Sequence, residues 1–108
     1  MAVDLRELTL LVSDVDASAR FYEPIGLALF CIEELEYPRH YDGELGLQLW
    51  PATARRPVSC VQLGFVVEDI SATVRRLDAV GASWTCDLPN LVRTSEPEGN
   101  KITLTQRR

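Results

Sequence analysis

The sequence has few of the residues that usually carry catalytic chemistry. Its 108 residues include one histidine, His40, and three cysteines whose separations match no metal or redox motif. A Gly-rich phosphate loop, a G-x-S-x-G elbow, a C-x-x-C pair and an H-E-x-x-H helix are all missing. Because a facial-triad Fe(II) oxygenase needs two histidines and a carboxylate, the single histidine excludes that class of enzyme.

Positive charge and long apolar runs are also scarce. The net charge is −5 and there is no basic stripe, so nucleic acid is not an expected partner. No apolar run approaches the roughly 20 residues that cross a bilayer, and residues 1–7 lack the apolar stretch of a secretory signal. We therefore expect a cytoplasmic protein with no membrane partner. The mild acidity favours solubility, and it leaves a cationic ligand open as an alternative.

The cysteines predict the redox compartment. Cys31, Cys60 and Cys86 are an odd number, and each lies among apolar or β-forming neighbours. A free cysteine usually behaves as a small buried apolar residue, and disulfides are rare in the cytoplasm. We expect three buried, free thiols.

The chain repeats itself after 55 residues, the separation of Leu8 and Leu63. Segment 8–20 aligns with segment 63–75, and the register continues without a gap to Leu49 and Leu104. One copy alone cannot bury its apolar face, so the two copies are expected to pack together. We predict a single domain, 1–108, that consists of module one (1–51), a linker (52–58) and module two (59–108).

Each copy has the pattern of a βαβββ unit. Asp14 and Asp69 are N-cap candidates, and Gly26 and Gly81 end the helices that follow. In copy one the predicted strands are 5–12, 27–33, 37–41 and 44–50, and the helix is 16–23. In copy two the predicted strands are 60–67, 82–86, 91–94 and 101–106, and the helix is 70–80. The fold class is α+β, and the pattern leaves the strand order open.

Two turns complete this description. Asp42-Gly43 is a hairpin signal, after which Leu45, Leu47 and Leu49 are expected on one face of a strand. In the turn 96–100, Gly99 and Asn100 are expected to supply the positive φ angles of a tight connection.

Three segments carry a resemblance to a known family. They are VSDVDASARFY at 12–22, Gly26-Leu27, and EPEGNKITL at 96–104, and through the repeat they cover essentially the whole chain. Together they resemble the vicinal oxygen chelate superfamily, which includes glyoxalase I, bleomycin-resistance proteins and extradiol dioxygenases. The resemblance implies two tandem βαβββ modules that form a half-open barrel with a cleft. The third strands are short, so we expect a homodimer in which a partner completes the cleft, with modules paired in cis or exchanged between chains.

The resemblance also selects four site residues. Metalloenzymes of this superfamily place one ligand in the first and one in the last strand of each module, which corresponds here to Glu7, Gln48, Gln62 and Thr103. One carboxylate, two amides and a hydroxyl are a poor ligand set for Zn, Ni or Fe(II). Thr103 also replaces the carboxylate that the family uses for proton transfer at carbon. We therefore expect these side chains to line an organic-ligand cleft with no cofactor, while Glu7, Gln48 and Gln62 remain the metal candidates.

Three further residues belong to the predicted ligand-binding set. They are His40, which the resemblance implies to lie at the cleft mouth, and the aromatic residues Tyr41 and Trp50. We interpret His40 as a hydrogen-bonding residue, with a general base as the alternative. Trp50, like Trp84, either fills a core or dimer contact or stacks on a ligand.

Three functions remain open. The first is a binding protein, not an enzyme, that holds a small organic molecule in the cleft without a metal. The second is a glyoxalase-type lyase or isomerase that uses a divalent metal such as Ni, Zn, Mn or Co, with Glu7 as ligand and catalytic base. The single histidine excludes extradiol dioxygenase chemistry. The third is a degenerate module that serves only dimerisation or regulation.

Overall fold

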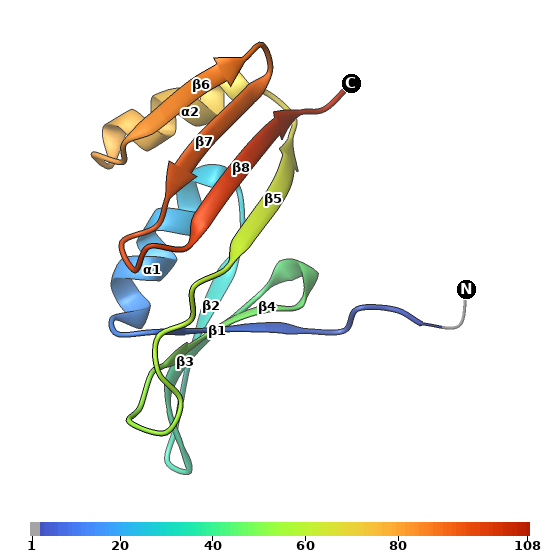
Figure 1. Cartoon of the computed structure of the whole chain (residues 1–108). Coiled ribbons are helices and arrows are strands. Elements are labelled where there is room, and N and C mark those ends of the chain that lie inside the picture. Colours follow the sequence, from blue (N-terminus) through green and yellow to red (C-terminus); the bar gives the residue numbers. More distant parts are fainter. Residues whose placement is uncertain (1–2) are drawn as a thin grey trace.

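The computed structural model describes residues 3–108 and contains eight strands and two α-helices among them (Figure 1). Module one holds β1 (Leu8–Val12), α1 (Val15–Tyr22), β2 (Leu29–Glu34), β3 (Tyr37–Gly43) and β4 (Leu47–Pro51). Module two holds β5 (Gln62–Val67), α2 (Ile70–Ala79), β6 (Trp84–Leu88), β7 (Leu91–Ser95) and β8 (Lys101–Gln106). Two short 3₁₀ helices, η1 (Glu23–Ile25) and η2 (Glu44–Gly46), lie in module one. The predicted α+β fold of two tandem βαβββ modules is confirmed.

The two modules form separate four-stranded sheets of the same topology. The first sheet has the order β1-β4-β3-β2 and the second β5-β8-β7-β6. In each sheet the first and last strands of the module are parallel neighbours, and the other pairs are antiparallel. No strand pairing among residues 3–108 joins the two sheets. Figure 1 shows both helices on one side of the molecule, with the sheets diverging from them.

The helices begin and end where the sequence predicts. Asp14 accepts a hydrogen bond from the Ala17 backbone N–H at 3.0 Å, and Asp69 accepts one from Ala72 at 3.1 Å. Each carboxylate thereby satisfies one of the backbone donors that a helix start leaves open. Gly26 has φ +109°, a conformation that side-chain-bearing residues rarely adopt, so the chain turns there after η1. None of the helices in the described part of the chain is long and apolar enough to cross a bilayer.

The structure corrects the predicted strand that starts at residue 44. Strand β3 continues through Gly43, and the turn falls in η2, so β4 starts only at Leu47. Leu47 and Leu49 are buried as expected, but Leu45 is 75% exposed and has φ +64°. The Asp42-Gly43 signal therefore predicts the turn too early, since the positive φ angles of the turn fall at Leu45 and Gly46. Strand β1 likewise begins at Leu8, not at residue 5.

Two further expectations are wrong. Cys31, Cys60 and Cys86 are free but exposed, because Cys31 and Cys86 lie on the edge strands β2 and β6 and Cys60 lies in the segment just before β5. Asn100 does not have a positive φ, whereas Gly99 does, at +91°. The Asn100 side chain is instead fully buried and accepts a hydrogen bond from the Val61 backbone N–H at 2.8 Å.

A buried polar junction ties the modules together. Tyr22, at the end of α1, is fully buried beside Glu96, which is 2% exposed and accepts a hydrogen bond from Asn100 Nδ2. Close by in sequence, Glu98 Oε1 accepts backbone N–H groups of Ser13 at 3.0 Å and Asp14 at 3.1 Å. The β7–β8 turn of module two is therefore hydrogen-bonded to the start of α1 in module one.

Candidate functional site

Each sheet has one face packed against helices and one open face. In the first sheet, Leu10, Leu49 and Tyr41 are direct cross-strand partners on the helix-facing side. Side chains alternate along a strand, so the neighbouring row lies on the open face. That row consists of Thr9, Gln48, Asp42 and Phe30. In the second sheet the corresponding open-face row is Gly64, Thr103, Arg93 and Thr85.

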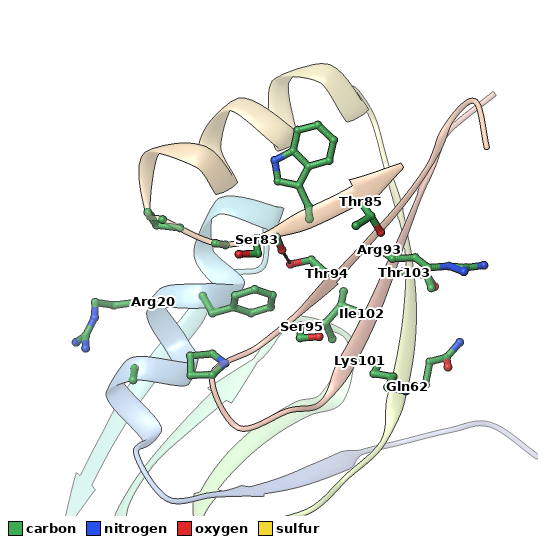
Figure 2. Close-up of a pocket in the computed structure, with 17 residues that line it drawn as sticks. Arg20, Gln62, Ser83, Thr85, Arg93, Thr94, Ser95, Lys101, Ile102 and Thr103 are labelled. Atoms are coloured by element: carbon green, nitrogen blue, oxygen red, sulfur yellow. Dashed lines mark hydrogen bonds between the residues drawn. The ribbon is translucent and has the colours of Figure 1, made fainter. Parts of the chain in front are cut away.

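The second sheet borders a wide hollow of about 1070 Å³, which we call the module-two hollow (Figure 2). Gln62 and Thr103, two residues of the predicted set, line it. Figure 2 shows Gln62, Thr85, Arg93 and Thr103 on one side of the strands and Thr94 and Ile102 on the other. The remaining lining residues are Ala17, Arg20, Phe21, Val80, Gly81, Ala82, Ser83, Trp84, Ser95, Pro97 and Lys101.

The two sides of this hollow differ in access. On the helix side, Phe21 is 5% and Ile102 0% exposed, so these side chains are already packed. Trp84 is more exposed, and its indole Nε1–H donates to Asp78 Oδ1 at 2.8 Å. On the open face, Gln62 and Lys101 are exposed and Thr103 is half-buried. The volume of about 1070 Å³ is thus shared between the two sides of the strands, and the polar side chains on the open face are the more accessible part of its lining.

Polar residues other than the predicted ones share that open face. Lys101 is the cross-strand partner of both Gln62 and Ser95, and Arg93 is the partner of both Thr103 and Thr85. The sequence analysis missed Lys101, Arg93, Ser95 and Thr85. For Arg93, Ser95 and Lys101 the alternation with buried residues in β7 and β8 was the available signal, because period 2 marks the exposed face of a strand.

The open face of the first sheet holds an aromatic and polar cluster. The rings of His40 and Trp50 stack with centroids 3.8 Å apart and an angle of 13° between planes, and Tyr37 meets Trp50 edge-on. The Trp50 indole Nε1–H donates to Gln48 Oε1 at 2.9 Å. Trp50 and Gln48, both predicted ligand contacts, are thus already engaged with each other.

His40 is held from several sides and is 6% exposed. Its Nδ1 lies 2.9 Å from the Pro38 carbonyl oxygen, so this nitrogen carries the hydrogen and donates it. Its Nε2 lies 3.6 Å from Asp42 Oδ1, a buried oxygen with no hydrogen-bond partner in the described structure. This placement suits the hydrogen-bonding interpretation of His40 better than a general base, which needs access to substrate.

Tyr41 lies on the opposite face from Gln48 and Trp50. Its hydroxyl donates to Asp16 Oδ1 of α1 at 2.5 Å, and Arg39 Nη2 donates to the same oxygen at 2.9 Å. The hydrogen bonds from Tyr41 and Arg39 lower the pKa of Asp16, and the same bond to Asp16 raises the pKa of Tyr41. Tyr41 therefore anchors α1 to the first sheet and does not share a surface with the other predicted residues.

The predicted quartet is divided between the two sheets. Glu7 is exposed just before β1, and Gln48 lies in β4, whereas Gln62 and Thr103 line the module-two hollow. No group of three or more His, Cys, Asp or Glu side chains within the described residues is placed to hold a metal ion. With one carboxylate, which lies outside the hollow, these residues do not fit the metal site of the family's enzymes.

The architecture identifies the fold. TnmS3, an antibiotic-binding protein from Streptomyces sp. CB03234, is 23% identical, with a TM-score of 0.74 over 100% of this chain and 99% of that chain. The chain has the vicinal oxygen chelate fold. The fosfomycin resistance protein FosX from Mesorhizobium loti is 15% identical, with a TM-score of 0.74 over 100% and 94% of the two chains. Glyoxalase I from Leishmania major is 16% identical, with a TM-score of 0.75 over 97% and 87%.

Sequence comparisons give no closer assignment. No protein-family model matches the chain, and no curated protein matches it in sequence. The structural neighbours include an antibiotic-binding protein, a resistance protein and a glyoxalase, so the vicinal oxygen chelate fold is compatible with binding and with catalysis. The choice between them has to come from the side chains of this chain.

Proposed function

We propose that this protein binds a small organic molecule on the open face of the second sheet, without a metal. The observation that carries the proposal is the row of polar side chains on this face, which borders the module-two hollow. The hollow has a volume of about 1070 Å³ over both sides of the strands. Gln62 and Thr103 supply polar contacts there, and the similarity to an antibiotic-binding protein supports the same role. The free thiols of the three cysteines support a reducing compartment such as the cytoplasm.

The competing function is a metal-dependent glyoxalase-type lyase or isomerase with Glu7 as base. The placement of Glu7 outside the hollow disfavours it, as does the hydroxyl of Thr103 in place of a carboxylate. Imidazole is the usual nitrogen ligand for Zn, Ni or Co, and the single His40 is stacked on Trp50 in the first sheet.

Thermal unfolding of EDTA-treated protein tests both functions in one experiment. A ligand at 100 times its Kd adds about 2.7 kcal/mol of stability, which raises the midpoint by several degrees in a chain of this size. We expect this rise with members of a panel of antibiotics, and none with Mn, Ni, Co, Zn, Fe(II) or Mg. Thr103→Val should reduce the antibiotic shift, while Thr105→Val, on the same strand but outside the hollow, should leave it unchanged.

The opposite result would overturn the proposal. If an ion raises the midpoint and Glu7→Ala abolishes the rise, the protein is a metalloprotein and turnover of α-oxoaldehydes becomes the next assay. If neither ions nor organic compounds stabilise the protein, the binding function fails as well.

We also propose that the protein acts as a homodimer. Each open sheet face carries an exposed apolar side chain, Phe30 at 62% and Val66 at 55%. A two-fold axis can place the first sheet of each copy opposite the second sheet of the other copy.

A further inference from the structure

We propose that the module-two hollow recognises the anionic end of its organic ligand, an oxyanion such as a carboxylate or phosphate, with Lys101 as the principal cationic contact. This inference rests on the proposed binding function and names the chemical class of the ligand. The anionic ligand proposed here is opposite in charge to the cationic ligand that the net charge of −5 leaves open.

The charges that line the hollow are opposite in sign to the charge of the whole chain. Arg20, Arg93 and Lys101 line it, and none of its described lining residues is acidic. The acidic residues outnumber the basic ones, 16 to 11, so a wall with three cations and no described carboxylate is not expected from composition. Local charge of one sign attracts the opposite charge in a ligand.

The cations differ in how they can act. Figure 2 shows Arg20 directed away from the strands, on the outer side of α1. Arg93 already takes part in an interaction within the chain. Lys101 is exposed and forms no ion pair with any of the described residues. Lys101 is therefore the cation that a ligand can engage without breaking an existing contact.

Neutral donors surround Lys101 on the same face. Its direct cross-strand partners are Gln62 and Ser95, and Thr103 is two residues along its own strand. Side chains in these positions lie about 4.5–7 Å apart, so one oxyanion can reach several of them. An ammonium, an amide N–H and hydroxyl groups are all donors, and an ionised acceptor makes such hydrogen bonds shorter and stronger.

A glycine keeps this part of the face accessible. Gly64 is the cross-strand partner of Thr103, and a Cβ atom placed there would lie 3.0 Å from Thr103 Oγ1. A larger side chain at position 64 would therefore press on the hydroxyl that the ligand is to meet. The missing side chain leaves space beside the Thr103 hydroxyl, which donates a long hydrogen bond of 3.5 Å to the Leu63 carbonyl oxygen.

The experiment uses the fact that Lys101 is the only lysine among the 108 residues. Reductive ¹³C-methylation keeps the positive charge and gives one lysine methyl signal, separate from that of the terminal amine. We would titrate the full chain with 2-naphthoate, 2-naphthyl phosphate, 2-naphthamide and 2-naphthamidine, which share a ring and differ in charge. We expect the lysine signal to shift saturably with the two anions and not with the neutral or cationic compound. The tighter of the two anions distinguishes a carboxylate from a phosphate ligand.

Matched variants separate local from overall charge. Lys101→Gln should weaken binding of the better anion by about tenfold, the loss of one charge-assisted hydrogen bond. Arg55→Gln removes the same charge from the exposed linker and should change affinity less than about twofold. Equal losses in both variants would show that only the overall field matters and would overturn the inference.

The other outcomes separate this inference from the proposed function. If 2-naphthamide binds as tightly as 2-naphthoate, the hollow binds aromatic molecules without reading their charge, and only the anion inference falls. If no naphthyl compound binds and the antibiotic panel also fails to stabilise the protein, the binding function falls with it.

Discussion

At the scale of single residues, Glu96 is a titratable group that is buried at the junction of the two modules. Its Oε1 is hydrogen-bonded by Asn100, whereas its Oε2 and the neighbouring Tyr22 hydroxyl complete no hydrogen bond of normal geometry. Burial raises the pKa of Glu96, and Tyr22 and Asn100 only partly oppose that shift. Burial, together with the nearby Glu96, raises the pKa of Tyr22 in turn.

This placement predicts a pH dependence of stability. A group whose pKa is higher in the folded chain contributes stability below its unfolded pKa, about 4.3 for Glu, and loses it as the pH rises through the folded pKa. At pH 7 we expect the free energy of unfolding of Glu96→Gln to be at least that of the wild type, and higher by up to about 1 kcal/mol. Near pH 4 the difference between the two proteins should be smaller. Urea unfolding from pH 4 to 8 measures this, with Glu36→Gln on an exposed loop as control. If Glu96→Gln is less stable than the wild type at pH 7, the ionised carboxylate of Glu96 stabilises the fold and the prediction is wrong.

At the scale of elements, the 55-residue repeat places equivalent caps on equivalent helices. Asp14 and Asp69 each accept a hydrogen bond from the backbone N–H three residues later, with nearly the same backbone angles. The equivalence extends to the core, where Leu49 of β4 and Leu104 of β8 are both fully buried. The sequence repeat therefore produces the same helix cap and the same buried strand position in both modules.

The equivalent caps predict equal costs. Asp14→Ala and Asp69→Ala should each lower the free energy of unfolding by about 1 kcal/mol, because each leaves a helical N–H without its acceptor. Chemical denaturation of the two variants and of Asp4→Ala, an exposed control outside any helix, measures the losses. A loss at Asp14 much larger than at Asp69 would show that the nearby contacts of Glu98 depend on the first cap.

At the scale of the whole molecule, the single chain is less compact than a typical domain of its length. The radius of gyration is 14.4 Å, against about 13 Å for a compact domain of this length. The chain extends over 45 × 39 × 22 Å because the open faces are not packed on each other. Uncovered sheet faces with exposed apolar side chains are typical of protein interaction surfaces.

This shape predicts a dimer whose interface includes the open faces. Sedimentation should give about twice the chain mass of 12.1 kDa. Val66→Glu, on the open face of β5, should weaken the dimer by about tenfold or more, since it buries an unpaired charge. Val80→Glu, at a valine that is 54% exposed compared with 55% for Val66, should leave the dimer intact because Val80 lies at the end of α2. A wild-type monomer at micromolar concentration would contradict the prediction.

Local sequence patterns predicted the structural features that depend on neighbouring residues in the chain. The helix caps, the helix stop at Gly26 and the repeat of βαβββ units follow from residue types a few positions apart, and the structure confirms them. The predicted start of β4 is wrong because the turn brings Gly46 so close to the backbone of Arg6, which is remote in sequence, that a Cβ atom at position 46 would collide with it. The cysteines were wrongly placed for a similar reason: exposure on β2 and β6 depends on which strands form the sheet edges.

The candidate site divides in the same way. The sequence by itself determined two tandem βαβββ modules, and its resemblance to the vicinal oxygen chelate superfamily led to the choice of Gln62 and Thr103, because repeat and motifs are both read along the chain. Only the tertiary structure decided that Lys101 and Arg93 join them, that Tyr41 faces away and that Glu7 and Gln48 lie outside the hollow. Which side chains share a face depends on strand register and sheet packing, and these bring together residues from distant parts of the chain.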